Sequence, residues 1–264
     1  MSVRRQLGAI VYGHPVYRAV RDSAPAQALL DYAPRRATFF DGSTRLVPRQ
    51  LARLIKHWRT HVGRYEESCQ SYYAYGGGDV LDIGAFHGWY SVLLAPKASQ
   101  GDTFVSIEPN PKAFPTLLST LSFVAKLFPT LVTYALPIAI GDGGAMTVTF
   151  PHGRQGHPRF ASAADATEGA TPTMTVDSLV CTLNLRPSYI KVDVEGAEYF
   201  VLRGMQETLA RFGPRVLLEV HPRWQPADVT VAQVEALLAR NGYTKVEVDV
   251  TDLAIRQLWT YGSH

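Results

Sequence analysis

Cysteine is scarce in this sequence, and the two residues present, Cys69 and Cys181, are far apart. They do not have the spacing of a zinc site, and one pair cannot form the dense disulfide framework of a small secreted domain. No run approaches ~18 consecutive apolar residues, the length that a membrane-spanning helix needs. The apolar run after the basic start, residues 1–5, is too short for a secretory signal. These absences argue against a disulfide scaffold, a zinc finger and a membrane span, and they favour a cytoplasmic protein.

The composition is typical of a globular fold. The 264 residues are 46% hydrophobic and 19% charged, which suits one large domain, or one domain with an extension. The charge is unevenly distributed: residues 1–77 carry 12 Lys or Arg and 5 Asp or Glu, whereas residues 78–264 carry 14 and 18. The first segment could therefore attract an anionic partner, or it could simply expose solvated arginines on helix faces.

The basic N-terminal segment is predicted to be mainly helical. Within residues 49–62 the apolar residues recur at helical spacing, and Arg49, Arg53 and Lys56 form a basic stripe on the other side. The glycine run at residues 76–78 then ends the helical pattern. We therefore expect two domains: an N-terminal extension or lid at residues 1–77, and a second domain at residues 78–264.

From residue 79 onward short apolar strands alternate with helices. Strands are predicted at 79–83, 103–107, 131–140, 146–150, 189–194 and 216–220, and helices at 87–95, 112–128, 197–212 and 230–241. Residues 151–172 are predicted to be a loop, and residues 243–250 and 254–261 a closing hairpin. Alternating strands and helices form right-handed crossovers and a parallel sheet, so the predicted class is α/β.

The first motif that carries chemistry lies in residues 80–88, where Asp82 ends a strand and a glycine-bearing turn leads into a helix. In open α/β sheets, ligands bind where strands end and helices begin, and glycine lets the backbone approach them. The spacing Asp-x-Gly-x-x-x-Gly differs from the Gly-x-Gly-x-x-Gly of dinucleotide binders. A carboxylate here would repel a pyrophosphate and suits a ligand with an amino group. The alternative is a tight turn that binds no ligand.

A second acidic residue, Glu108, ends the next strand, 26 residues after Asp82. This is close to the roughly 20-residue spacing at which a carboxylate accepts hydrogen bonds from the two ribose hydroxyls of a nucleotide. The alternative is a helix start, which Asn110 could provide without Glu108. Together the two motifs favour an adenosyl ligand with an amino-acid tail, which describes S-adenosylmethionine better than NAD or ATP.

The third motif places charged residues in and after a strand that should be central. Lys191, Asp193 and Glu195 alternate with apolar residues, and charges are expensive to bury in a parallel sheet. Glu219 and His221 follow the next strand, so adjacent strand ends would bring all of these side chains together. The alternative is an internal ion-pair network around Lys191.

These motifs occur in an order that strongly resembles the FkbM family of S-adenosylmethionine-dependent methyltransferases. Six segments carry the resemblance: residues 82–88, 108–110, 139–142, 175–179, 190–198 and 218–221. It covers about residues 78–221 plus the closing strands, and its most specific part is Lys-Val-Asp-Val-Glu-Gly-Ala-Glu. It implies a Rossmann-like class I methyltransferase fold, with a seven-stranded, mostly parallel sheet whose last strand is antiparallel. It also implies O-methylation of hydroxyls on sugars or natural products.

The resemblance also implies roles for individual residues. Asp82 and the turn residues Gly84, Ala85, Phe86 and Gly88 would hold the methionine end of S-adenosylmethionine, Glu108 the ribose, and Asp142 would border the adenine. Phe86 stands where the general methyltransferase loop has its middle glycine. The backbone must therefore approach the ligand differently.

Transfer to an alcohol requires an in-line arrangement of oxygen, methyl carbon and sulfur, and a means of removing the hydroxyl proton. Two chemistries fit the residues. In the first, His221 or Lys191 is the general base. In the second, Asp193 and Glu219 bind Mg²⁺, which acidifies a bound hydroxyl. We favour the metal-free chemistry, because a hard ion would need more oxygen ligands than the sequence assigns.

Two rival functions use the basic N-terminal segment instead. In one, the chain is an RNA-binding or anionic-polymer-binding protein without catalysis; in the other, it is an RNA O-methyltransferase. No RNA-binding motif is present, so a nucleic acid partner is not expected. The expected partner is a small-molecule or saccharide hydroxyl acceptor, and a homo-oligomer is left open.

Overall fold

The computed structural model describes residues 34–38, 44–57, 75–144, 146–149, 159–162 and 171–262. The chain divides into two compact units, Met1–Tyr65 and Glu66–His264. Among the described residues, no helix is long and apolar enough to cross a bilayer. The end of the helix expected at 49–62, and Cys69, lie outside the described residues.

The described part of the first unit is a hairpin followed by a helix. Strand β1 (Pro34–Thr38) pairs antiparallel with β2 (Thr44–Pro48), and α4 (Arg49–His57) follows directly. Leu51 and Ile55 of α4 are buried, whereas Arg53 and Lys56 of the predicted basic stripe are exposed and Arg49 is partly exposed. The hairpin was not predicted, because each strand is too short to show a clear alternation in the sequence.

The second unit is built on a seven-stranded sheet with the order β12-β13-β11-β10-β3-β4-β5. Its strands are β3 (Asp79–Ile83), β4 (Thr103–Ile107), β5 (Val132–Leu136), β10 (Pro187–Val192), β11 (Arg215–Val220), β12 (Tyr243–Val250) and β13 (Ile255–Tyr261). Only the pairs that involve β13 are antiparallel. The predicted α/β class and its seven-stranded sheet with an antiparallel last strand are therefore confirmed.

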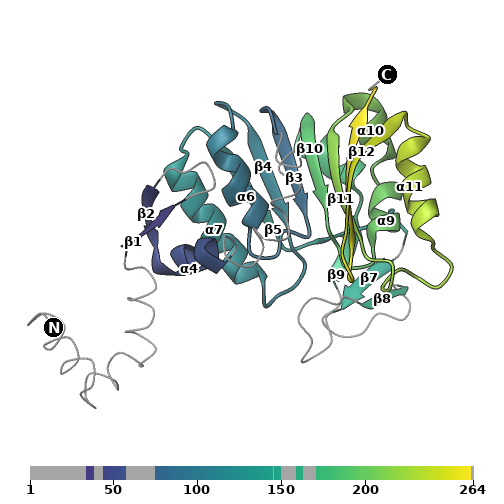
Figure 1. Ribbon diagram of the computed structural model, residues 1–264, viewed down its shortest axis with the longest axis horizontal. Helices are drawn as coiled ribbons and strands as arrows, with labels where there is room; N and C mark the ends of the chain where they lie inside the picture. Colours follow the sequence, from purple (N-terminus) through teal and green to yellow (C-terminus); the bar gives the residue numbers. More distant parts are fainter. Residues whose placement is uncertain are drawn as a thin grey trace, which may run out of the picture. The chain divides into compact units, whose positions relative to one another are not determined.

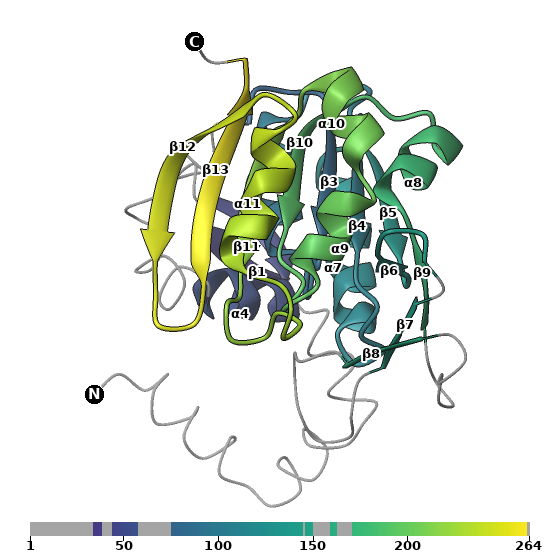
Figure 2. The ribbon, with the colours of Figure 1, turned by 90° about the vertical axis from the view of Figure 1, so that its right-hand side faces the viewer.

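Helices cover both faces of this sheet (Figure 1). The chain first moves outward from β3 to β4 and β5, through α6 (Trp89–Leu94) and α7 (Phe114–Leu127). It then returns to β10 and moves the other way, through α9 (Glu198–Arg203), α10 (Gln206–Phe212) and α11 (Val231–Ala239). Because both sets of crossovers are right-handed, the two sets of helices lie on opposite faces. Figure 2 shows α9, α10 and α11 in front of the sheet.

Three predicted elements differ from the structure. The strand expected at 131–140 is two strands, β5 and β6 (Ala139–Ile140), which belong to different sheets. The helix expected at 197–212 is two helices, because the chain at Gly204 packs against another segment: a Cβ atom there would lie 2.0 Å from the carbonyl oxygen of Gly141. The predicted loop at 151–172 contains strand β8 (Arg159–Ser162) and the start of β9 (Thr171–Met174). With β6 (Ala139–Ile140) and β7 (Met146–Thr149) they form a second sheet, ordered β6-β9-β7-β8.

Three further segments belong to the second unit: a 3₁₀ turn, a glycine run and a short helix. The 3₁₀ turn η3 (Ala95–Lys97), which contains Pro96, follows α6. The glycine run at residues 76–78, where the sequence places a domain boundary, belongs to the second unit: Gly78 N donates to Asp102 Oδ2 at 3.0 Å. Helix α8 (Val176–Thr182) was not predicted, and Thr175 caps its first turn.

The strand order of the sheet also indicates where a ligand could bind. Because the chain leaves β3 in one direction and returns on its other side at β10, the strand order reverses between these two strands. In open α/β sheets the crevice at such a switch point, beyond the carboxyl ends of the strands, is where ligands bind. Lys191 of β10 lies opposite Asp82 of β3 in register, one residue before the carboxyl end of each strand.

Candidate functional site

The turn after β3 lies tightly against the end of β10. Gly84 has a φ of +77°, and a Cβ atom at this position would lie 1.7 Å from the carbonyl oxygen of Asp193. Only glycine can therefore occupy this position. The backbone N–H groups of Gly84 and Ala85 both donate to the Ile107 carbonyl, at 3.0 and 2.9 Å. The turn is thus held between the ends of β10 and β4.

The rest of the turn exposes an aromatic side chain. Phe86 has a φ of +48°, which is unusual for a residue with a side chain, and its ring is about half exposed. It stacks on the His87 ring with a centroid distance of 3.7 Å. Gly88 has a φ of +84° and is the N-cap of α6. A larger residue at Gly88 would press on Leu117 and Thr120 of α7.

Glu108, at the end of β4, faces this turn. One of its carboxylate oxygens accepts from Phe86 N and the other from Asn110 N, both at 2.8 Å. Burial raises the pKa of Glu108, and the two backbone N–H groups oppose that rise. Each carboxylate oxygen has a second lone pair, so both oxygens retain capacity for further donors.

Asp82 is the least satisfied acid of the site. It is 1% exposed, and neither carboxylate oxygen accepts a hydrogen bond from the described residues. Its nearest charge is the Lys191 ammonium, 3.6 Å from Oδ1. Burial raises the pKa of Asp82, although Lys191 pulls it down. A buried carboxylate without hydrogen bonds is rare in folded proteins, and one explanation is a ligand that supplies the missing donors.

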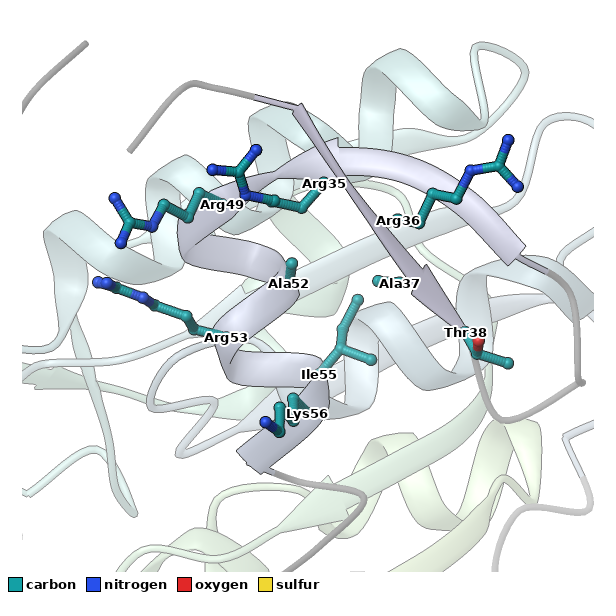
Figure 3. Close-up of a pocket in the computed structure, with 9 residues that line it drawn as sticks. All are labelled: Arg35, Arg36, Ala37, Thr38, Arg49, Ala52, Arg53, Ile55 and Lys56. Atoms are coloured by element: carbon teal, nitrogen blue, oxygen red, sulfur yellow. The ribbon is translucent and has the colours of Figure 1, made fainter. Parts of the chain in front are cut away.

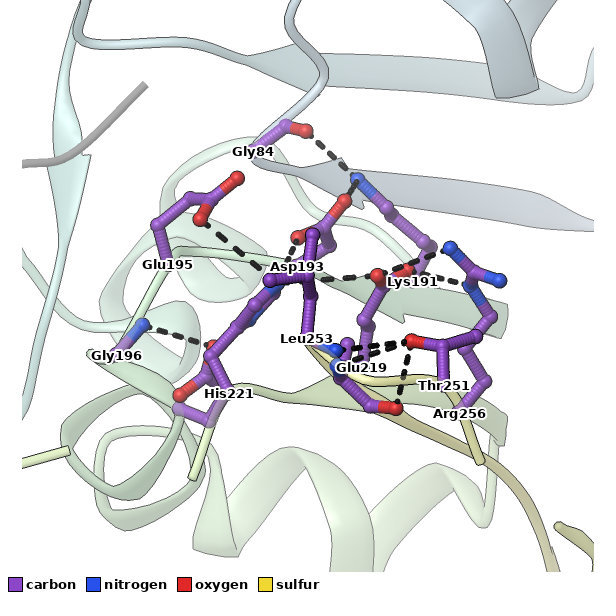
Figure 4. A network of polar contacts seen from close by, with 12 residues as sticks. Gly84, Lys191, Asp193, Glu195, Gly196, Glu219, His221, Thr251, Leu253 and Arg256 are labelled. Carbon is purple, nitrogen blue, oxygen red and sulfur yellow. Dashed lines mark hydrogen bonds and ion pairs between the residues drawn. The ribbon is translucent and has the colours of Figure 1, made fainter. Parts of the chain in front are cut away.

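Lys191 links the carboxyl ends of β3 and β10 (Figure 4). Its Nζ atom donates to the Gly84 carbonyl at 2.7 Å, lies 3.2 Å from Asp193 Oδ2 and sits 5.3 Å from the centre of the Tyr90 ring. Burial lowers the pKa of Lys191, but the neighbouring carboxylates outweigh burial and raise it above its ordinary value. The side chain is therefore a charged donor at neutral pH, as in the ion-pair network that the sequence left open. The alternative role of general base would first require the loss of this proton.

His221, which follows β11, is surrounded by carboxylates. Its Nδ1 atom lies 2.9 Å from Glu198 Oε1. Its Nε2 atom lies 3.7 Å from Glu195, 3.7 Å from Glu219 and 3.9 Å from Asp193. Burial lowers the pKa of His221, but the hydrogen bond to Glu198 and the carboxylates of Asp193, Glu198 and Glu195 raise it to about 9. The imidazole is therefore protonated at neutral pH, and its proposed action as a base requires that proton to leave.

Glu198 was not among the predicted site residues, yet it orients the imidazole. It is fully buried at the start of α9. Besides meeting His221, it accepts from Gly196 N at 3.0 Å and from the side-chain amide of Gln225. The ring of His221 also stacks on Trp224 at 4.7 Å. Glu198 is the last residue of the most specific sequence motif and stands at the start of a predicted helix. These two features of the sequence could have indicated its role.

Two more acids border the histidine. Glu219 receives both N–H groups of the Arg256 fork, at 2.8 and 3.1 Å. Burial and Asp193 raise the pKa of Glu219, whereas Arg256 lowers it. Glu195 has a φ of +56°. Burial and the negative charge of Asp193 raise the pKa of Glu195 to about 7, although His221 opposes the rise. Glu195 therefore changes charge close to neutral pH.

Asp193, Glu219 and His221 form a group that could hold a metal ion. One ligand atom from each lies within 4.8 Å of the others. The hydrogen bond from His221 Nδ1 to Glu198 leaves Nε2 facing the two carboxylates, an arrangement that is common behind metal-binding histidines. The donor set of two oxygens and one nitrogen fits a divalent cation.

Asp142 stands apart from the other predicted cofactor residues. Its carboxylate lies 3.1 Å from Arg203 of α9 and accepts from Gly144 N at 3.1 Å. None of the described contacts joins it to Asp82 or Glu108. The structure thus brings Asp82, Glu108, Lys191, Asp193, Glu219 and His221 to one edge of the sheet. The roles of these residues and of Asp142 stay predictions.

Known proteins resemble this chain in sequence. A family model described as the methyltransferase FkbM domain matches residues 82–245. Hexuronic acid methyltransferase AglP of Haloferax volcanii is 29% identical over 165 residues, which are 61% of this chain and 64% of that protein. The chain therefore spans less than two thirds of that relative's length.

Solved structures with a similar arrangement include a methyltransferase FkbM from Methylobacillus flagellatus KT. It has a TM-score of 0.46 and 15% identity, with 79% of this chain and 54% of that chain covered. Another is Aeropyrum pernix fibrillarin in complex with natively bound S-adenosyl-L-methionine. Its TM-score is 0.48 and its identity 11%, with 87% of this chain and 84% of that chain covered.

Proposed function

The chain belongs to the FkbM family of S-adenosylmethionine-dependent methyltransferases, and we propose that it transfers the methyl group of S-adenosylmethionine to a hydroxyl oxygen of a sugar. One observation carries the proposal: Asp82, buried and without a hydrogen bond from the described residues, lies on β3 at the switch point of the sheet, and Glu108 follows the neighbouring strand β4. The α-ammonium group of the cofactor would supply the donors that Asp82 lacks. Glu108 would accept the ribose hydroxyls with its remaining lone pairs.

The turn between β3 and α6 would hold the methionine end of the cofactor. Gly84, Ala85 and Gly88 bring the backbone close without side chains in the way, and Phe86 would lie against the ligand. Asp142 would border the adenine. The ion pair between Asp142 and Arg203 would then have to lie near the adenine ring. The methyl group would then face the ends of β10 and β11, where Asp193 and His221 lie.

We propose a hexuronic acid as the first acceptor to test, because the relative AglP is named a hexuronic acid methyltransferase. Such a sugar offers both hydroxyl and carboxylate oxygens. Five carboxyl groups lie around the ends of β3, β10 and β11: those of Asp82, Asp193, Glu195, Glu198 and Glu219. Three cationic side chains lie among them: Lys191, His221 and Arg256. This excess of negative charge would repel a carboxylate, so we expect methylation of a hydroxyl.

His221 is the proposed base, and its protonation sets the pH dependence. With a pKa raised to about 9, the imidazole is mostly charged at neutral pH. It accepts the hydroxyl proton only in the fraction of molecules that have lost their own, so metal-free turnover should rise up to about pH 9. Glu198 would hold Nε2 toward the acceptor throughout. Lys191 would remain a charged donor that fixes the turn at Gly84.

A divalent cation such as Mg²⁺ is the second candidate chemistry, and the cluster of Asp193, Glu219 and His221 favours it. These three residues would hold the ion, and when bound it would lower the pKa of a coordinated hydroxyl. Binding requires a neutral imidazole, so the cation and the proton compete for His221. The bidentate pair with Arg256 also competes for Glu219.

The proposed function is tested by incubating the full chain with methyl-labelled S-adenosylmethionine and saccharides that contain hexuronic acid. We expect label in the sugar as an ether that survives mild alkali, because an ester would be hydrolysed. The variant Asp193→Asn should lose transfer, whereas Glu207→Gln, an exposed position on α10, should retain it. Cofactor binding without methyl transfer would refute hexuronic acid as the acceptor. Absence of cofactor binding would refute the whole proposal.

A further inference from the structure

The first unit contains a pocket that the proposed methyl transfer does not use. It has a volume of about 480 Å³ and lies between β1 and α4 (Figure 3). Nine residues line it: Arg35, Arg36, Ala37, Thr38, Arg49, Ala52, Arg53, Ile55 and Lys56. This volume is within the range of small-molecule sites.

The charge of the lining is of one sign. Five of the nine residues are cationic, and the described stretches 34–38 and 44–57 contain no Asp or Glu. The side chains of Arg35, Arg49 and Arg53 extend to the same side of α4 and β1, whereas Arg36 extends to the other side (Figure 3). Helix α4 begins with Arg49 and has no acidic residue in its first turn. The positive end of the helix dipole therefore has no acidic side chain of the first turn to offset it.

The kind of cation and the remaining lining indicate the ligand. Four of the five cations are arginines, whose planar fork binds phosphate through two parallel hydrogen bonds. The other lining residues are Ala37, Thr38, Ala52 and Ile55, so the described lining has no aromatic ring on which a nucleic acid base could stack. A phosphate group fits this lining better than single-stranded nucleic acid does.

We propose that this pocket binds the phosphate or diphosphate group of a ligand. The proposal does not depend on methyl transfer, because no residue of the pocket belongs to the site at the sheet edge. The phosphate could belong to a free phosphorylated molecule or to a lipid headgroup, and these two sources share the chemistry that the arginines recognise.

The test is calorimetric titration of the full chain with inorganic pyrophosphate at low ionic strength. The pocket variants are Arg49→Gln and Arg53→Gln, and the matched control is Arg45→Gln, which removes the same charge from β2 outside the pocket. We expect saturable binding that each pocket variant weakens about tenfold or more, the usual effect of losing one charged hydrogen-bonding partner. The control should change the affinity less than about twofold. Circular dichroism of each variant checks the fold.

A second arm uses sedimentation with vesicles of phosphatidylcholine that contain phosphatidic acid. Vesicle binding that pyrophosphate displaces would support the proposal and identify a lipid headgroup as the source. Pyrophosphate binding without vesicle binding would also support it and identify a free phosphate. The proposal is overturned if pyrophosphate does not bind saturably, or if all three variants weaken binding equally. Vesicle binding that is indifferent to pyrophosphate and to Arg49→Gln would overturn it as well.

Discussion

Replacing Glu198 by glutamine tests how the site controls the charge of His221. The carboxylate is fully buried and accepts from His221, Gly196 and Gln225. Glutamine has the same shape, and its amide oxygen can still accept from His221 and Gly196. Its NH₂ group would face Gln225, whose Oε1 atom is buried without a hydrogen bond from the described residues. A flip of Gln225 would satisfy both amides, so the variant should fold.

The expected effect follows from the pKa of His221. In the folded protein it is raised to about 9, against an ordinary value of 6.5. The protonated imidazole therefore stabilises the fold fully below pH 6.5, and this contribution is lost as the pH rises through 9. A difference of this size corresponds to roughly 3 kcal/mol, at 1.36 kcal/mol per pKa unit. In Glu198→Gln the pKa of His221 should fall, because the neutral amide no longer favours the imidazolium.

The assay is urea unfolding of chelator-treated protein at pH 6, 7.5 and 9, together with an NMR titration of the His221 ring. At pH 6 the variant should lose about 1.5–3 kcal/mol, the usual contribution of a hydrogen bond to a charged group. Between pH 6 and 9 its stability should fall less than that of the wild type. Glu207→Gln, which removes an exposed charge, should differ from the wild type by less than about 0.5 kcal/mol. An unchanged titration of His221 in Glu198→Gln would refute this reasoning.

Three further predictions concern the turn, the buried lysine and the cation. Gly84→Ala should destabilise the protein by more than about 3 kcal/mol in urea unfolding because of the contact with Asp193, whereas Gly101→Ala, with a φ of +88° but open space around it, should cost about 1 kcal/mol. Lys191→Met should cost about 3–5 kcal/mol, since it leaves the carboxylates beside it without their cation; a thermal midpoint equal to that of the wild type would contradict the ion-pair network. In chelator, turnover should rise with pH up to about 9 as His221 loses its proton, and added Mg²⁺ should shift the rise to lower pH. Identical pH–rate profiles with and without the cation would exclude the metal chemistry, and a flat profile would exclude His221 as the base.

Local patterns were enough to predict most of the sheet and its acidic strand ends. Asp82 and Glu108 each follow a short apolar run, and such a run with a turn after it indicates a buried strand that ends at the carboxylate. Because parallel strands end at the same edge, the proximity of Asp193, Glu219 and His221 also followed from the sequence. The structure shows this proximity through the contacts of Asp193 and Glu219 with His221 Nε2.

Features that depend on pairing between distant segments could not be predicted. Arg256 meets Glu219 because β13 pairs antiparallel with β11 in a particular register, which no local pattern records. Glu198 meets His221 only once α9 packs beside β11. The break in the helix at Gly204 depends on its contact with Gly141, and strands β8 and β9 exist through their pairing with β6 and β7. The charge of His221 is a consequence of the same distant contacts.

The most direct test of the account is calorimetric titration of the full chain with S-adenosylmethionine, comparing the wild type with Glu108→Gln and Glu207→Gln. The account predicts saturable binding to the wild type, about tenfold or more weaker binding to Glu108→Gln, and unchanged binding to Glu207→Gln. The thermal midpoint of each variant shows whether the fold is retained, since Glu108 also accepts from Phe86 N and Asn110 N. Equal affinity in the wild type and a folded Glu108→Gln would contradict the proposed cofactor site, and so would a wild type that does not bind S-adenosylmethionine.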